Sequence, residues 1–134
     1  MDKEINALLD AVDKNFKNCN WIKEQSPDSY LAELEDEVRE LREAIKNKDT
    51  ENIKEELGDV LWDVISLIKI IERDEKIAAK EIPKAVVDKF KRRKPYIFEG
   101  KSVSIEEASK IWQKAKEEEK LNKTKKRAKE ENAR

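Results

Sequence analysis

Two stretches, YLAELEDEVRELREAI (residues 30–45) and IKEELGDVLWDVISLIKII (residues 53–71), decide the fold of this chain. In both, apolar residues recur every three or four positions, which is the period of a helix with one buried face. Both stretches are therefore predicted to be long helices. Asn47-Lys48-Asp49 is a short connection between the two helices, so they can pack against each other as an antiparallel pair.

Two acidic pairs with i, i+3 spacing, Glu37/Glu40 and Glu56/Asp59, border the apolar faces of these stretches. Residues three apart share one side of a helix, so an antiparallel pair would bring the four carboxylates together at the edge of the core. Partly buried like charges are unfavourable unless they are neutralised. A hard divalent cation with oxygen ligands, Mg²⁺ or Mn²⁺, can neutralise them. Since 46% of the chain is charged, the alternative is that these pairs form an ordinary solvated surface.

The composition excludes several kinds of chemistry. The 134 residues suit one domain, and 30 basic against 31 acidic residues leave a net charge of −1, which makes a nucleic-acid partner unlikely. The absence of histidine excludes imidazole catalysis, and two glycines are too few for a glycine-rich phosphate loop. With one cysteine and no apolar run of about 20 residues, we expect a soluble cytoplasmic protein with no membrane partner.

The predicted fold is all-α: a four-helix-bundle-type domain with an additional C-terminal helix. A first helix is expected over residues 3–17, followed by a loop over residues 18–29. The remaining boundaries rest on caps and prolines: Ser26-Pro27 opens the second helix, Asp49 or Thr50 caps the third, Glu81-Ile82-Pro83 starts the fourth, Pro95 stops it, and Ser104 caps the fifth. The domain is predicted to cover residues 1–118, with a charged tail, helical or disordered, over residues 119–134.

The third helix is apolar on most sides, since ten of its fifteen residues between Leu57 and Ile71 are large and apolar. Such a helix needs cover on most sides. We therefore expect a homodimer or a higher assembly based on dimers. The alternative is a monomer in which Trp62, Ile65 and Ile70 meet the terminal helices.

Cationic and aromatic residues gather in the C-terminal third. Lys89, Arg92 and Arg93 form a basic cluster at the end of the fourth helix, where cations also match the helix dipole. Trp112 and Lys116 are i, i+4 and can present a ring and an ammonium together. Core filling is the alternative for Trp112.

These motifs, taken in order, resemble those of the MazG-like all-α nucleoside triphosphate pyrophosphohydrolases. That family carries E-x2-E, a spacer, and E-x2-D, which the two acidic pairs match. CNWIKEQS resembles the family's C-P-W-D-x-E-Q-T loop, although Asn20 and Ile22 replace the usual proline and aspartate. KFKRRKPYIF matches K-x-x-R-R-x-P-x-x-F, with Lys94 in place of a common histidine, and IWQKAK matches W-x-x-x-K. The resemblance covers residues 3–118.

The resemblance implies an enzyme that hydrolyses a nucleoside triphosphate to the monophosphate and pyrophosphate with Mg²⁺, for which Mn²⁺ can substitute. It implies that Glu37, Glu40, Glu56 and Asp59 are the metal ligands and the catalytic residues. It further implies a nucleotide site, with phosphate contacts from Lys89, Arg92 and Arg93 and other contacts from Glu33, Trp21, Trp112 and Lys116. A role in clearing the nucleotide pool would follow.

Two alternatives stay open. One is a specialised hydrolase of dUTP or dCTP from the same superfamily, which only a panel of substrates can separate. The other is a non-catalytic helical module that binds a partner or RNA through the lysine-rich tail, although interspersed acids dilute that charge. Truncation after residue 118 would test the tail.

Overall fold

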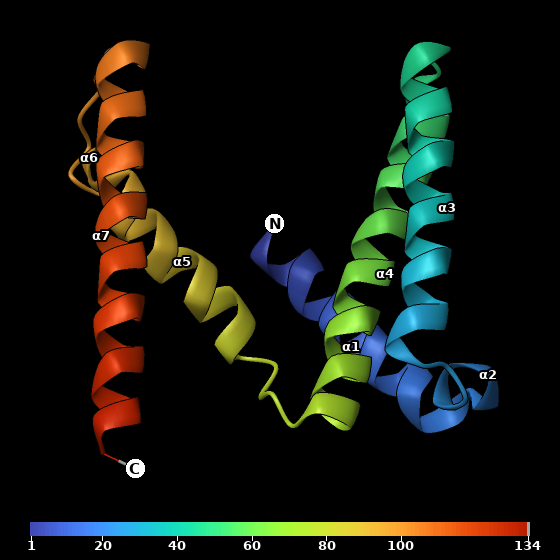
Figure 1. Ribbon diagram of the computed structural model, residues 1–134. Helices are drawn as coiled ribbons and strands as arrows, with labels where there is room; N and C mark the ends of the chain where they lie inside the picture. Colours follow the sequence, from blue (N-terminus) through green and yellow to red (C-terminus); the bar gives the residue numbers. More distant parts are fainter. Residues whose placement is uncertain (134) are drawn as a thin grey trace. The chain divides into compact units, whose positions relative to one another are not determined.

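The computed structural model describes residues 1–133, in which α-helix is the only regular secondary structure (Figure 1). The all-α prediction is confirmed, whereas the four-helix bundle and the dimer stay predictions. The helices form two compact units, Met1–Ala79 and Lys80–Arg134, and each is described by itself. Within residues 1–133, every helix is too short or too polar to cross a membrane.

The first unit contains α1 (Asp2–Asn18), α2 (Asn20–Lys23), α3 (Pro27–Lys46) and α4 (Thr50–Glu75). In Figure 1, α3 and α4 lie side by side as an antiparallel pair, and this pair has the most extensive contact in the chain. The first helix, α1, packs against α4, and Lys69 of α4 pairs with Asp13 of α1 at 2.8 Å. The two stretches that decide the fold therefore form its central hairpin.

Side-chain caps set the N-terminal starts of the two hairpin helices, α3 and α4. The Ser26 hydroxyl accepts a hydrogen bond of 3.0 Å from the Ser29 backbone N–H, and Pro27 occupies the first turn of α3. Asp49, not Thr50, caps α4: its carboxylate accepts from the Asn52 N–H at 3.2 Å. The predicted starts of α3 and α4 are confirmed to within a few residues.

Two predicted boundaries of the first unit are wrong. The segment predicted as a loop over residues 18–29 contains the single turn α2, because Ile22 becomes fully buried there. The third predicted helix continues past Ile71 to Glu75 and ends at Lys76, which has a left-handed backbone with φ 56°. The added turn, ERDE, is polar, so the apolar period stops before the helix does.

The core of the first unit lies where α2, α3 and α4 meet. Ile22, Tyr30 and Ile70 form a buried cluster, against which Phe16, Cys19 and Leu67 are packed. The lone cysteine of the chain is therefore partly buried beside the core. The core thus anchors the α2 segment to the hairpin.

The second unit contains α5 (Glu81–Arg93), α6 (Pro95–Phe98) and α7 (Ile105–Asn132). Pro95 ends α5 as predicted but also starts α6, a turn that the sequence analysis missed. The Ser104 hydroxyl caps α7 by accepting from the Glu107 N–H at 3.1 Å. Helix α7 runs through residue 118 without a break and ends at Asn132. Of the two forms predicted for the tail, helical or disordered, the structure therefore has the helical one over residues 119–132. The domain boundary at residue 118 stays a prediction.

Candidate functional site

The α3–α4 hairpin brings the two acidic pairs together. One carboxylate oxygen from each of Glu37, Glu56 and Asp59 lies within 4.8 Å of the others. Glu40 joins this acidic cluster through a contact between its carboxyl group and that of Glu56. The i, i+3 spacing puts each pair on one helix side, and the antiparallel packing turns the two sides toward each other.

Burial, together with neighbouring negative charges, controls the protonation of the cluster. Burial, then the contact with Glu56, then the negative charges of Glu40, Asp59 and Asp63 raise the pKa of Glu37 to about 7. Burial, followed by the contact with Glu40, also raises the pKa of Glu56. Part of the cluster is therefore protonated near neutral pH while no cation is bound.

The cluster has the donors that a hard cation needs. Among residues 1–133, the buried Oε2 atoms of Glu37 and Glu56 have no hydrogen-bond partner. An unpaired buried carboxylate oxygen is costly, and a divalent cation would satisfy both atoms at once. Since all the donors are carboxylate oxygens, the set fits Mg²⁺ or Mn²⁺ and not a softer metal.

A fifth acid, Asp63, lies one turn beyond Asp59 on α4 and is 8% exposed. The Tyr30 hydroxyl donates a hydrogen bond of 2.9 Å to Asp63 Oδ1. Burial raises the pKa of Asp63, and the bond from Tyr30 opposes that rise. Neither Tyr30 nor Asp63 is among the predicted site residues, although Asp63 has i, i+4 spacing from Asp59 and shares its side of the helix.

Two other predicted site residues of the first unit border this acidic cluster. Glu33 is exposed on α3, and its charge contributes to raising the pKa of Asp63. Trp21 is 53% exposed, and its ring centroid lies 6.2 Å from that of Tyr30. Trp21 is thus connected to the cluster through Tyr30 and Asp63.

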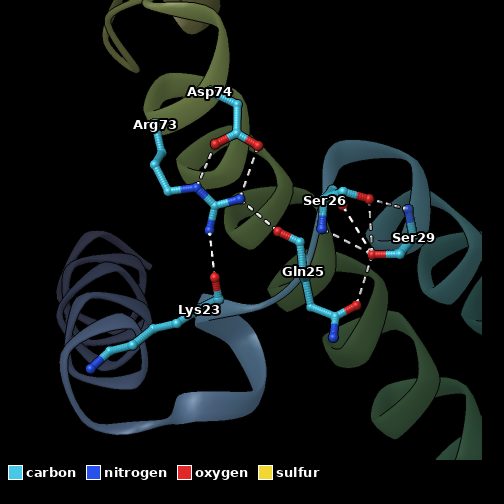
Figure 2. A network of polar contacts seen from close by, with 6 residues as sticks. All are labelled: Lys23, Gln25, Ser26, Ser29, Arg73 and Asp74. Atoms are coloured by element: carbon cyan, nitrogen blue, oxygen red, sulfur yellow. Dashed lines mark hydrogen bonds and ion pairs between the residues drawn. The ribbon is translucent and has the colours of Figure 1, made fainter.

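Arg73 holds the segment that carries Trp21 (Figure 2). Its guanidinium donates to the carbonyl oxygens of Lys23 at 3.2 Å and Gln25 at 2.6 Å. Asp74 accepts from the same guanidinium at 2.6 and 3.0 Å and so orients it. The turn after α2 is therefore tied to the end of α4.

All three predicted phosphate-binding residues lie in the second unit, and two of them, Arg92 and Arg93, contact the same carboxylate. The guanidinium carbon of Arg93 lies 4.9 Å from the centroid of the Trp112 ring, and that ring also packs against Phe90 at 6.0 Å. Arg92 and Arg93 both pair with Glu119, at 2.7 and 2.9 Å.

Two further predicted residues take no part in these contacts. Lys89 is half-buried one turn before Arg93. Lys116 is exposed, and the cations over the Trp112 ring are Arg93 and Lys94. The joint presentation of Trp112 and Lys116 to a nucleotide stays a prediction.

The hairpin and its acidic cluster define the chain as an all-α protein with a carboxylate site suited to a divalent cation. Residues 25–98 match the family described as the MazG nucleotide pyrophosphohydrolase domain. The structure is similar to that of a mazG-related protein from Thermotoga maritima, with a TM-score of 0.80 and 34% identity over 84% of this chain and 98% of that one. The chain belongs to the MazG nucleotide pyrophosphohydrolase family.

Curated relatives extend this likeness beyond the matched domain. The nucleoside triphosphate pyrophosphohydrolase of Mycolicibacterium smegmatis is 34% identical over 84% of this chain, and that of Escherichia coli K12 is 30% identical over 78%. The chain spans only 36% and 40% of the lengths of these two relatives. The family domain contains both acidic pairs and the basic cluster, whereas Trp21, Trp112 and Lys116 lie outside residues 25–98.

Proposed function

We propose that this chain is a Mg²⁺-dependent nucleoside triphosphate pyrophosphohydrolase, which converts an NTP or dNTP to the monophosphate and pyrophosphate. The observation that carries the proposal is the convergence of Glu37, Glu56 and Asp59 within 4.8 Å on a hairpin that matches the MazG domain. The two curated relatives, both named nucleoside triphosphate pyrophosphohydrolase, support the same reaction.

The acidic cluster would hold the metal through Glu37, Glu40, Glu56 and Asp59. When bound, Mg²⁺ offsets the negative charges of the carboxylates and of the triphosphate, and it activates water for attack on phosphorus. Mn²⁺, which prefers the same oxygen donors, can take its place. Below pH 7 a proton competes for this site, because the pKa of Glu37 is raised to about 7.

The other residues would bind and orient the nucleotide. In the hydrolysis, water forms a new bond to phosphorus, the bridge between the α and β phosphates breaks, and pyrophosphate leaves with the electron pair. Lys89, Arg92 and Arg93 offset the negative charge that develops on this leaving group. Trp21 and Trp112 would offer ring surfaces for the base, and Glu33 and Lys116 would make further contacts with the nucleotide.

We propose in addition that two copies of the chain pair through the hairpin. Several of its large apolar side chains are at least 40% exposed in the single chain: Val38, Ile45, Leu57, Leu61 and Val64. An apolar hollow of about 370 Å³ follows α4 along Leu57, Leu61 and Val64. A contiguous apolar surface of this kind is typical of a protein–protein interface.

The biological role that fits the proposed hydrolysis is the clearing of unwanted nucleotides in the cytoplasm.

A panel of NTPs and dNTPs, assayed for pyrophosphate in the presence of Mg²⁺, tests the proposed reaction. We expect the wild-type protein to release pyrophosphate, and the panel also separates a general enzyme from one specialised for dUTP or dCTP. Glu37→Ala, Glu40→Ala, Glu56→Ala and Asp59→Ala should each abolish the activity. Glu35→Ala, which removes an exposed carboxylate from α3, is the matched control and should leave the rate unchanged. An unchanged rate in two of the four variants would defeat the metal assignment.

A further inference from the structure

One carboxylate in the second unit bridges two consecutive arginines. Glu119 Oε1 accepts from Arg92 Nε at 2.7 Å, and Oε2 accepts from Arg93 Nε at 3.3 Å and Nη2 at 2.9 Å. The side chains of Arg93 and Glu119 are only 16% and 18% exposed. Glu119 lies outside residues 25–98, which match the family domain, and beyond the predicted end of the domain at residue 118.

Two effects oppose the approach of the Arg92 and Arg93 guanidinium groups to each other, and the bridge from Glu119 offsets both. Consecutive residues on a helix point about 100° apart, and two guanidinium groups repel each other. A single carboxylate between them removes the repulsion and supplies charge-assisted hydrogen bonds to both. The paired arginines hold the pKa of Glu119 down at about 2, so the carboxylate is ionised throughout the neutral range.

The bridge leaves part of each guanidinium available. Within residues 1–133, Nη1 and Nη2 of Arg92 and Nη1 of Arg93 make no hydrogen bond, because Glu119 uses the Nε side of both groups. Trp112 lies 4.9 Å from the Arg93 guanidinium and holds it from another direction. Arginine recognises phosphate through such N–H donors.

We propose that Glu119 is a positioning residue for the phosphates of the nucleotide: it holds Arg92 and Arg93 together so that both guanidinium groups meet the same pyrophosphate portion. This inference rests on the proposed function, which assigns both arginines to phosphate groups. The opposite arrangement, in which Glu119 competes with phosphate for the arginines, predicts an effect of opposite sign. The free Nη donors favour positioning, since phosphate can be bound without the loss of the Glu119 bonds.

Glu119→Gln tests the proposal in the full-length chain. Calorimetry with inorganic pyrophosphate and Mg²⁺ should show affinity weakened about tenfold, the loss expected when a charge-assisted bond is removed. The KM for the best nucleotide of the panel should rise by a similar factor, with a smaller change in kcat. Glu118→Gln, which makes the same charge change at the adjacent exposed position, is the matched control and should change either value less than about twofold.

A double-mutant cycle separates positioning from a general structural role. In an Arg92→Gln background, Glu119→Gln should weaken pyrophosphate binding less than it does alone, because one of the two arginines that it positions is already gone and only Arg93 remains to be held. Equal losses in both backgrounds would overturn the proposal. Truncation after residue 118 cannot serve here, since it removes the whole of α7 beyond that residue together with Glu119.

Other outcomes also count against the proposal. Unchanged or tighter pyrophosphate binding by Glu119→Gln overturns it, as does a wild-type protein that binds no pyrophosphate. Failure of the wild type to cleave any nucleotide overturns the proposed function instead, while the calorimetry still tests Glu119. Circular dichroism checks that the variants stay helical. If Glu119→Gln does not fold, Glu119→Asp takes its place in the test. This variant shortens the side chain by one methylene and should also weaken pyrophosphate binding.

Discussion

The Tyr30 hydroxyl and the Asp63 carboxylate form a buried hydrogen bond of 2.9 Å between the start of α3 and the middle of α4. Tyr30 is 2% exposed and Asp63 is 8% exposed, so water can hardly replace either partner. Asp63 lies one turn from Asp59 on α4, and the Tyr30 ring centroid lies 6.2 Å from that of Trp21. The bond therefore links the packing of the core to the acidic cluster.

Tyr30→Phe should lower the free energy of unfolding by about 1–3 kcal/mol, because it leaves a buried carboxylate without its donor. The pKa of Asp63 should rise further, since the bond from Tyr30 lowers it. Urea unfolding measures the stability. Tyr96→Phe is the control: within residues 1–133, Tyr96 is hydrogen-bonded through its backbone carbonyl, which the substitution keeps, so the change should be within about 0.5 kcal/mol. Equal losses in the two variants would contradict this role of the bond.

Arg73→Ala should release the turn after α2, because two backbone carbonyls of that turn lose their donor. We expect a loss of about 1–3 kcal/mol in the free energy of unfolding and faster amide hydrogen exchange over residues 19–26. Arg39→Ala removes an exposed arginine that forms an ion pair with Asp36 of the same helix and should cost less than about 1 kcal/mol. Unchanged exchange in Arg73→Ala would show that the core alone holds this segment.

The metal-free protein should become less stable as the pH rises from about 4.5 to about 7. The pKa of Glu37 is raised from 4.5 to about 7, so the native state binds more protons than the unfolded chain in this window, and its stability falls as those protons leave. Thermal melts in EDTA at pH 5 and pH 7.5 measure the effect. Glu37→Gln should reduce the difference between the two pH values, and an undiminished difference would assign it to other groups.

Addition of Mg²⁺ should restore the stability of the wild-type protein most strongly at the higher pH, where no proton competes for the Glu37 carboxylate. The measurement is the rise in melting temperature on adding millimolar Mg²⁺ at each pH. Glu35→Ala should retain the full rise, whereas Glu56→Ala should lose it. The same rise in both variants would place the bound cation elsewhere.

Leu57→Glu should shift the protein toward monomer, since it puts a charge into the apolar surface of the hairpin. Leu57 is 54% exposed in the single chain, so the change is tolerated there but is unfavourable in an interface. Light scattering after gel filtration measures the mass. Leu121→Glu changes an equally exposed leucine on α7 and should leave the mass unchanged; a wild-type monomer would contradict the proposed pairing.

The helices and most of their ends could be predicted from the sequence alone. The apolar period, the Ser26 and Asp49 caps and the proline signals are local features, and a helix is built from local contacts. The convergence of the two acidic pairs also followed, because a short connection turns the second helix back along the first. Single turns such as α2 were not predicted, because one turn is too short to show the apolar period that indicates a helix.

Only the tertiary structure decided which distant residues pair. Tyr30 and Asp63 are 33 positions apart, Arg73 and Gln25 are 48 apart, and Arg92 and Glu119 are 27 apart. No period or spacing marks such partners, because their meeting depends on how helices pack and on which polar groups become buried. In a chain that is 46% charged, many ion pairs are possible, and packing selects those that form.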